Sequence, residues 1–363
     1  MSPQTRFARR RWQTALALVV VFASVVAAVP PKVELKRETR EALARITADA
    51  LRAHVSFLAS DALEGRRAGA RGSDVAAEYI AAQFRRAGLE PAGENGSYFQ
   101  LATYTSRAAP NTEIKSRNVV GLLRGSDPKL RDTYVVLSAH YDHLGIRENL
   151  EGDQIFNGAN DDASGTAAVV EVAAALSTLK RRPRRSVLFV AFTGEEHGLR
   201  GSRFYAEHPL VPVARTIAQL NLEQIGRTDD TEGARVGAAT LTGFDYSDVS
   251  EILTAAGART GVQINKHPTN SDAFFSRSDN RPLADKGIPA HTLSVAYMFP
   301  DYHKPGDHWE KIDYPNMEKV VRTIALGVLA LADAAREPRW NESNPKTAQY
   351  VKAWRELRAG AAR

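Results

Sequence analysis

Residues 133–192 decide the fold class. They contain TYVVLSA at residues 133–139, ASGTAAVVEVAAALSTL at 163–179 and SVLFVAF at 186–192. The first and last segments are short apolar runs of the length of buried strands, and the middle segment is long enough for a helix. A strand, a helix and a second strand in this order predict two parallel neighbours in one sheet.

The same alternation of strand and helix extends in both directions. Upstream, helical periodicity at residues 39–63 and 75–89 precedes a strand pattern at 118–123. Downstream, the predicted order is a short helix at 198–206, a strand at 216–225, a helix at 249–256, a strand at 290–295 and a helix at 317–335. We therefore expect an α/β fold with a mostly parallel central sheet flanked by helices.

The domain organisation predicted from this pattern is simple. No internal repeat or low-complexity linker divides residues 37–336, so we expect them to form one domain. A segment at residues 1–28 precedes this domain. A polar tail at residues 337–363, interrupted by Pro338 and Pro345, follows it.

The N-terminal segment has the layout of a secretory signal. Four arginines between residues 6 and 11 precede an apolar run at residues 15–29, which contains the small residues Ala27 and Ala28. The alternative is an uncleaved membrane anchor, because the run is only a little shorter than the ~20 apolar residues that span a bilayer. In both cases we expect an exported protein, periplasmic or extracellular, with no membrane contact beyond this segment.

Composition excludes several classes of protein. The chain has 363 residues, of which 43% are hydrophobic and 25% charged, so it is globular rather than disordered. It has no cysteine, which excludes disulfides and thiolate metal sites and leaves histidine and carboxylates as metal ligands. Residues 1–28 carry four of the 48 basic residues and none of the 42 acidic ones, so the remainder has a net charge of only +2. We therefore expect no nucleic-acid partner.

Histidines and carboxylates follow the predicted strands in order. In open α/β sheets, ligands bind beyond the carboxyl ends of the strands. The residues at these positions are His140 and Asp142, Asp161 and Asp162, Glu195 and Glu196, Glu223, and His303. Zinc takes imidazole nitrogen and carboxylate oxygen, and two zinc ions that share a bridging carboxylate form a hydrolytic centre. The sequence thus predicts a two-metal site.

Five sequence blocks carry a resemblance to a known family. They are HYDHLG (140–145), NGANDDASG (157–165), FTGEEHGLRGS (192–202), NLEQIGR (221–227) and DYHKPGDH (301–308). In this order they resemble the blocks of the M28 zinc aminopeptidases, and ASDALEGRRAG upstream is similar to secreted bacterial members. The resemblance covers about residues 50–335 and implies a fold like that of the zinc-dependent exopeptidases.

The resemblance also implies a role for each metal ligand. It places His140 and Glu223 on one zinc ion, His303 and Glu196 on the other, and Asp161 between the two. Three carboxylates and one hydroxide balance two dications if both histidines are neutral, which avoids a large desolvation cost.

Two further residues are assigned by the same resemblance. Glu195 corresponds to the general base, and Asp142 to the carboxylate that orients His140. The family often has a cis peptide bond after the bridging aspartate, here between Asp161 and Asp162.

Other residues near the blocks have plainer interpretations. We expect Asp162 to cap the helix that follows it, and His143, His197 and His308 to be surface or hydrogen-bonded histidines. Glu223 departs from the resemblance, because the family usually has aspartate there. One extra methylene moves a carboxylate by ~1.5 Å if the backbone stays in place, at a site that tolerates about 0.5 Å.

The expected function is that of an exported dinuclear zinc aminopeptidase acting on peptides with a free N-terminus. One alternative is a glutaminyl-cyclase-like enzyme, which shares the fold and generally uses one zinc ion. A second is a carboxypeptidase or amidohydrolase, in which Arg277 or Arg281 would hold a substrate carboxylate. A third is a receptor-like relative without activity. For Phe274, Phe275 and Tyr297, pocket lining and core are both open.

Overall fold

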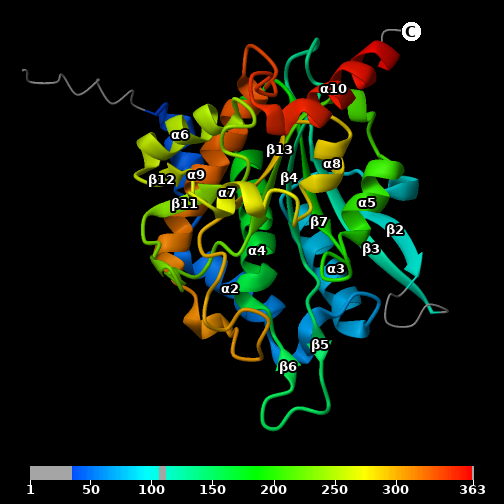
Figure 1. Cartoon of the computed structure of the whole chain (residues 1–363), viewed down its shortest axis with the longest axis vertical. Helices are drawn as coiled ribbons and strands as arrows, with labels where there is room; N and C mark the ends of the chain where they lie inside the picture. The colour runs from blue at the N-terminus through cyan, green and yellow to red at the C-terminus, as the bar shows by residue number, and fades with distance from the viewer. Residues whose placement is uncertain (1–34, 106–111, 362–363) are drawn as a thin grey trace, which may run out of the picture. The chain divides into compact units, whose positions relative to one another are not determined.

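A nine-stranded sheet forms the centre of the computed structural model, which describes residues 35–105 and 112–361 (Figure 1). Its strands are β1 (Glu90–Pro91), β2 (Phe99–Thr105), β3 (Glu113–Leu123), β4 (Tyr134–His140), β7 (Ser186–Phe192), β8 (Thr216–Glu223), β11 (Ala238–Leu241), β12 (Gln263–Asn265) and β13 (Ala290–Ser294). Their order is β1-β3-β7-β4-β8-β13-β11-β12, and β2 also pairs with β3. Two small ribbons pair β5 (Gly145–Ile146) with β6 (Ile155–Phe156), and β9 (Asp229–Asp230) with β10 (Gly233–Ala234).

The four central strands are parallel and both edges carry antiparallel pairs. β7, β4, β8 and β13 run in the same direction, whereas β3 is antiparallel to β7 and β11 is antiparallel to β13. The predicted α/β class with a central sheet is confirmed, but the sheet is mixed rather than mostly parallel. The physical reason is that antiparallel strands such as β2 and β3 need only a short connection and leave no crossover helix in the sequence pattern.

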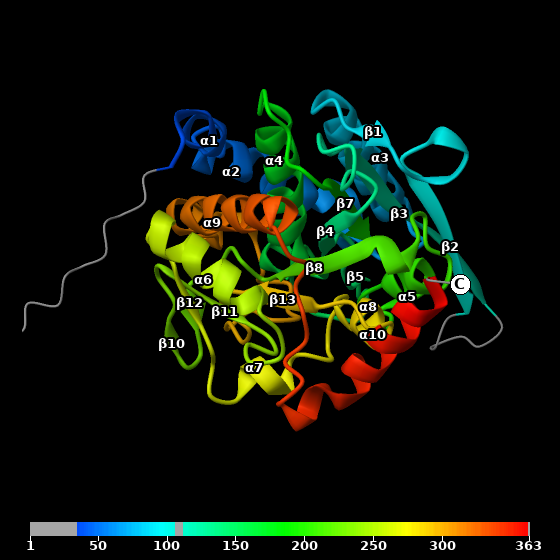
Figure 2. The same ribbon diagram turned by 90° about the horizontal axis from the view of Figure 1, so that it is seen from above.

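Helices cover both faces of the sheet (Figure 2). They are α1 (Arg37–Leu43), α2 (Ala48–Leu58), α3 (Arg71–Arg86), α4 (Gly165–Ser177), α5 (Arg200–Glu207), α6 (Val249–Thr260), α7 (Asn270–Ala273), α8 (Arg281–Asp285), α9 (Tyr314–Asp333) and α10 (Ala348–Ala361). On one face, α3, α4 and α9 contact the strands and α2 packs on α4 and α9. On the other face lie α5 and α8, with α10 packed against α8.

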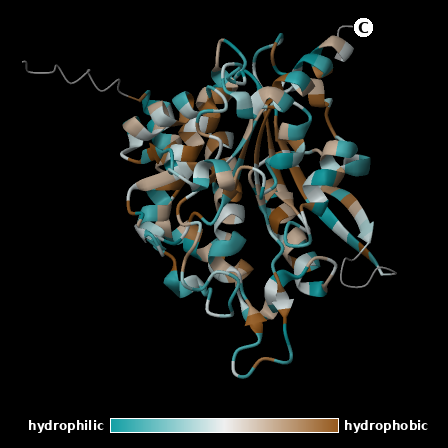
Figure 3. Cartoon of the chain, in the orientation of Figure 1, coloured by the Kyte–Doolittle hydropathy of each residue, from teal (hydrophilic) through white to brown (hydrophobic). Residues whose placement is uncertain are grey.

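Two covered faces explain the apolar sequence of the central strands. All seven residues of β7 and all eight of β8 are buried, as expected for strands with helices on both sides. Figure 3 shows brown, hydrophobic residues concentrated in the central strands, between helices that carry both teal and brown residues. The helix α4 is almost entirely buried as well, and its one charged residue, Glu171, lies 3.0 Å from His54 of α2.

The helix predicted at residues 39–63 is divided into α1 and α2. The Thr47 hydroxyl accepts a hydrogen bond from the Ala50 backbone N–H and so caps the start of α2. The described part of the predicted tail (residues 337–363) packs against the rest of the protein. Trp340 and Tyr350 are 5% and 4% exposed, with ring centroids 5.0 Å apart.

The predicted N-terminal segment, residues 1–28, lies outside the described residues. In the part of the chain that the structure describes, no helix has the length and apolar character needed to cross a membrane.

Candidate metal centre

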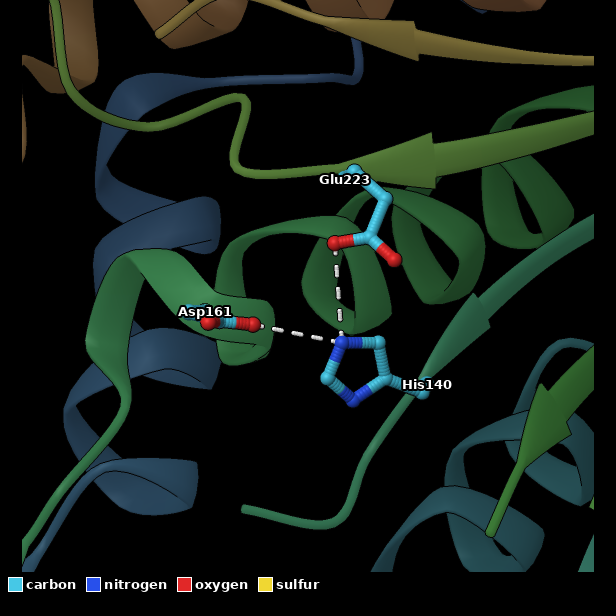
Figure 4. A group of neighbouring side chains, drawn as sticks. All are labelled: His140, Asp161 and Glu223. Atoms are coloured by element: carbon cyan, nitrogen blue, oxygen red, sulfur yellow. Dashed lines mark ion pairs between the residues drawn. The ribbon is translucent and has the colours of Figure 1, made fainter. Parts of the chain in front are cut away.

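His140 and Glu223 come from neighbouring parallel strands. His140 is the last residue of β4 and Glu223 the last residue of β8, so parallel pairing brings both side chains to one edge of the sheet. Nε2 of His140 lies 3.6 Å from Glu223 Oε2 and 3.2 Å from Asp161 Oδ1 (Figure 4). All three residues are buried, with exposures of 1%, 8% and 2%. Together they offer one nitrogen and two oxygens to a metal ion.

Asp161 also faces a second group of ligand atoms. Its other oxygen, Oδ2, lies 3.1 Å from Nε2 of His303, and the same nitrogen lies 3.4 Å from Oε1 of Glu196. Asp161 therefore has a different imidazole next to each of its two oxygens. The structure brings together all five residues that the sequence assigns as metal ligands.

The loop that carries Asp161 is fixed by hydrogen bonds to Asp307. The carboxylate of Asp307 accepts from the backbone N–H of Asn160 at 2.9 Å and from that of Asp161 at 3.1 Å. Gly158, at the start of this loop, has a φ of +56°, and a Cβ there would lie 2.5 Å from the ring of His143. The Asp161–Asp162 peptide bond is cis, as the resemblance implies. Asp307 lies in the DYHKPGDH block but was not among the residues predicted from the sequence.

Asp162 has the capping role that the sequence predicts. Its Oδ1 accepts from the backbone N–H of Gly165, the first residue of α4, at 3.0 Å. The same oxygen accepts from the backbone N–H of Gln224 at 3.1 Å. Asp162 thus connects the metal loop to the end of β8.

Arg66 lies beneath these loops and is fully buried. Its guanidinium donates to the backbone carbonyls of Tyr141 at 2.7 Å, Asn157 at 2.6 Å and Gly158 at 2.9 Å, and also to that of Leu58. Burial lowers its pKa to about 10, so it stays charged near neutral pH. Arg66 stands in the ASDALEGRRAG segment, where no sequence pattern indicates this structural role.

His143 is a buried member of the centre. Of the two roles expected for it, a surface or a hydrogen-bonded histidine, only the second is compatible with the structure, because the residue is 0% exposed and its Nδ1 lies 2.8 Å from Glu196 Oε1. Ligand atoms of His143, Asp161 and Glu196 lie within 4.8 Å of one another. The reason is that His143 follows His140 by three residues in the same strand-end loop. His308 lies at the surface, 3.3 Å from Asp153.

Asp142 links His140 to the segment that carries Glu195. The side chain of Asp142 is fully buried, and its backbone carbonyl lies 3.0 Å from His140 Nδ1. Its carboxylate Oδ1 is farther from that nitrogen, at 3.7 Å, and accepts from the backbone N–H of Glu195 at 3.2 Å. The carbonyl is thus the closer partner of His140, and the carboxylate positions Glu195.

Ser278 holds the longer side chain of Glu223. Its hydroxyl donates to Glu223 Oε1 at 2.5 Å, while the side-chain amide of Asn221 donates to the Ser278 oxygen at 2.7 Å. The other oxygen of Glu223, Oε2, is the one that faces His140. The structure therefore accommodates glutamate at this position.

The carboxylates give the centre a strong preference for cations. Burial alone would lower the pKa of His140, but Glu223 and Asp161 outweigh it and raise the pKa well above its usual range. Burial also acts to lower the pKa of His303, but the neighbouring carboxylates of Asp161 and Glu196 outweigh it and raise the pKa to about 10. Oε1 of Glu196 is buried and receives no hydrogen bond from the described residues. A nitrogen and oxygen donor set of this kind fits zinc.

A comparison with known families matches residues 118–328, more than half of the chain, to Peptidase family M28. The chain belongs to peptidase family M28. The predicted family is therefore confirmed.

Individual M28 relatives differ in length and in the activity that their names state. A probable zinc metalloprotease of Leptosphaeria maculans is 29% identical over 70% of this chain and 57% of its own length. The aminopeptidase NAALADL1 of Rattus norvegicus is 33% identical over 68% of this chain and 35% of its own length. The chain thus spans about half the length of the curated relatives that it matches.

Solved structures confirm the M28 type of fold. The aminopeptidase from Aneurinibacillus sp. strain AM-1 has a TM-score of 0.61 at 18% identity, covering 84% of this chain and 97% of that one. The glutaminyl cyclase of Porphyromonas gingivalis has a TM-score of 0.59 at 18% identity, covering 77% and 96%. Because proteins with different activities share this fold, the fold does not separate an aminopeptidase from a cyclase.

A cavity of about 80 Å³ adjoins the M28 centre. Glu195, Phe274 and Tyr297 are among the residues that line it. Phe275 does not line it and is 2% exposed, in the core beside Trp340 and Tyr350. Of the three aromatic residues left open by the sequence, two therefore line the cavity and one belongs to the core.

Proposed function

We propose that this chain is an exported zinc aminopeptidase with two zinc ions. The observation that carries the proposal is the position of Asp161, which presents one oxygen to His140 and the other to His303. A carboxylate with an imidazole on each oxygen has the arrangement needed to bridge two metal ions. The names of the relatives, zinc metalloprotease and aminopeptidase, support the metal and the reaction.

The proposed ligands form two sets. His140 and Glu223 would hold one zinc ion, His303 and Glu196 would hold the other, and Asp161 would be common to both. Bound zinc supplies a water molecule of lowered pKa and polarises the carbonyl of the scissile bond. Three carboxylates carry most of the charge that two dications require, which favours two zinc ions over the single zinc ion of a cyclase-like enzyme.

Glu195 is proposed as the general base. It lines the cavity beside Asp161, Glu196 and His303, so its carboxylate is within the space where substrate would enter. Burial, with the charges of Glu223 and Glu196, raises its pKa well above the usual range. A carboxylate with raised pKa takes up the proton of the attacking water and delivers it to the leaving amine more readily than an ordinary one.

The test of the aminopeptidase proposal compares blocked and free peptides. We expect the zinc-loaded protein to release the first residue of a short peptide with a free α-amine and to leave its N-acetylated form intact. Mass spectrometry of the products identifies the bond that is cut. Cleavage of the acetylated peptide at a comparable rate would contradict the proposal and favour the carboxypeptidase or amidohydrolase alternative.

Export is proposed from the N-terminal sequence alone. Four arginines followed by the apolar run at residues 15–29 have the order of a secretory signal. In a bacterial host that expresses the full chain, we expect the protein in the periplasm, the medium or the membrane fraction with its main part outside the cytoplasm. Recovery of the protein in the cytoplasmic fraction only would contradict this.

A further inference from the structure

The cavity beside the metal centre is lined by a positively charged side chain that the proposed mechanism does not use. Its lining comprises metal ligands, the proposed base and residues of the segment around α7. The residues without a role so far are Thr242, Phe274, Arg277, Thr292, Tyr297 and Tyr302. Arg277 is the only arginine or lysine among the residues lining this cavity, within the described part of the chain.

Arg277 has no acidic partner. Its guanidinium lies over the ring of Phe274, 4.6 Å from the centroid, and no carboxylate of residues 35–105 or 112–361 forms an ion pair with it. The acids nearest to it in the sequence have other partners. Asp272 pairs with Lys346 at 2.5 Å, and Asp279 accepts from the hydroxyl of Ser202 at 2.5 Å. The neighbouring Arg281, in contrast, is paired with Asp285 at 3.0 Å.

The carboxylates that line the cavity are committed to the reaction. Asp161, Glu196 and Glu223 are proposed metal ligands, and Glu195 is the proposed base. The guanidinium of Arg277 can therefore pair with a negatively charged group of the substrate. A guanidinium pairs with a carboxylate through two parallel hydrogen bonds, and its stacking on an aromatic ring holds its plane in place.

A second residue that lines the cavity, Tyr297, has a polar group without a partner. Tyr297 is only 6% exposed, and its buried hydroxyl makes no hydrogen bond within the described residues. A buried hydroxyl without a partner is unfavourable, and a ligand oxygen would satisfy it. The rings of Phe274 and Tyr297, whose centroids are 4.7 Å apart, offer an apolar surface beside these two donors.

We propose that Arg277 binds a carboxylate of the substrate close to the scissile bond. This inference rests on the proposed aminopeptidase function and names its substrate class. Two sources supply such a carboxylate: the side chain of an acidic first residue, whose methylene stem suits the aromatic surface, and the free C-terminus of a dipeptide. The enzyme then selects acidic or very short peptides rather than cleaving all free N-termini alike.

The test uses two pairs of substrates that differ only in one charge. Glutamyl- and glutaminyl-p-nitroanilide test the side chain, and Ala-Ala and its C-terminal amide test the terminus. With zinc-loaded protein we expect kcat/KM for the charged member to exceed that for its neutral partner by about 10- to 100-fold in one of the pairs, since a hydrogen-bonded charge pair contributes that much. The pair that shows the preference identifies the source.

Variants assign the preference to Arg277. In Arg277→Gln the ratio should fall to near one, and in Arg277→Lys part of it should remain. Arg281→Gln is the matched control, because Arg281 lies four residues away, is paired with Asp285 and does not line the cavity. The control should keep the wild-type ratio. No preference in either pair, or a preference that survives in Arg277→Gln, overturns the proposal.

A binding measurement separates this inference from the proposed function. If the wild-type protein hydrolyses none of the four compounds, the aminopeptidase proposal fails. Titration calorimetry with the same four compounds then still decides the role of Arg277. Tighter binding of a charged member that is lost in Arg277→Gln supports the carboxylate site, and equal affinities within both pairs contradict it.

Discussion

At the scale of single residues, the centre is organised by groups that each make contacts in two directions. Asp161 faces His140 at 3.2 Å and His303 at 3.1 Å, and Asp142 contacts His140 through its carbonyl and Glu195 through its carboxylate. A change at either aspartate therefore affects two functional groups at once. The side chain of Glu195 is assigned neither to a ligand set nor to a structural hydrogen bond. A substitution of Glu195 therefore tests proton transfer alone.

Replacing Glu195 by Gln removes the base and keeps the size of the side chain. We expect kcat to fall by about 10² to 10⁴-fold with the zinc content unchanged, because the effect is confined to proton transfer. Steady-state kinetics and metal analysis of the same preparation measure both quantities. Loss of zinc together with activity would show that Glu195 is a ligand.

The two imidazoles near Glu196 are expected to differ in role. His303 lines the cavity with Asp161 and Glu196, whereas His143 is fully buried and does not line it. We therefore expect His303→Ala to retain about one zinc ion per chain, as only one ligand set is broken. His143→Ala should still bind two, with the second weakened by about 10- to 100-fold, as for an orienting partner. The reverse result would make His143 the ligand.

The residues that the sequence assigns to the centre lie together in the structure, but the residues that position them were not predicted. His140, Glu195, Glu196 and Glu223 lie at or just after the ends of apolar strands, where a carboxylate or histidine is conspicuous, and Asp161 and His303 lie in loops of the same sequence blocks. Arg66 and Asp307 act through backbone carbonyl and N–H groups of distant loops, and such contacts leave no pattern of spacing. The sequence left open whether His143 lies at the surface or in a buried contact, because burial of a loop residue depends on what packs over it.

At the scale of elements, long buried strands were predicted from the sequence and very short strands were not. β4, β7 and β8 are buried on both faces, and their continuous apolar runs predicted them within one or two residues. β11 and β12 have only four and three residues, too few to show a period, and were not predicted. The division between α1 and α2 depends on the Thr47 cap, a local hydrogen bond within a segment of continuous helical periodicity.

Strand β13 contains a buried histidine. His291 of β13 is 0% exposed, with Nδ1 2.8 Å from the carbonyl of Thr242 and Nε2 2.6 Å from the hydroxyl of Ser247. Nδ1 must therefore carry the proton and donate it, while Nε2 accepts from Ser247. Burial lowers the pKa of His291 to about 4, so the ring is neutral in the folded protein.

This histidine predicts a pH dependence of stability. Between about pH 4 and 6.5 the unfolded chain takes up a proton on His291 that the folded protein does not, so the stability contribution is complete above pH 6.5 and is lost as the pH falls towards 4. The contribution is about 3 kcal/mol in the free energy of unfolding. Urea unfolding of wild-type and His291→Gln protein across this range should show a flatter pH dependence in the variant. Equal slopes would contradict the assignment.

At the scale of the whole molecule, the centre depends on the assembled fold. Its five proposed ligands lie between residues 140 and 303 and come from the ends of β4 and β8, the turn before α4, and the loops after β7 and β13. No short segment contains a complete ligand set. Zinc that binds only the folded chain therefore stabilises it. Loss of a ligand that belongs to one set should weaken one site without removing the other, whereas loss of Asp161 should weaken both.

The most direct test of the two-zinc centre is a zinc titration of metal-free protein. Equilibrium dialysis followed by metal analysis should give two zinc ions per chain for the wild type, with peptidase activity restored as they bind. Glu223→Ala, which removes a ligand of the zinc ion held by His140, should retain one. A wild-type protein that binds a single zinc ion, or a Glu223→Ala protein that still binds two with unchanged affinity, would contradict the account.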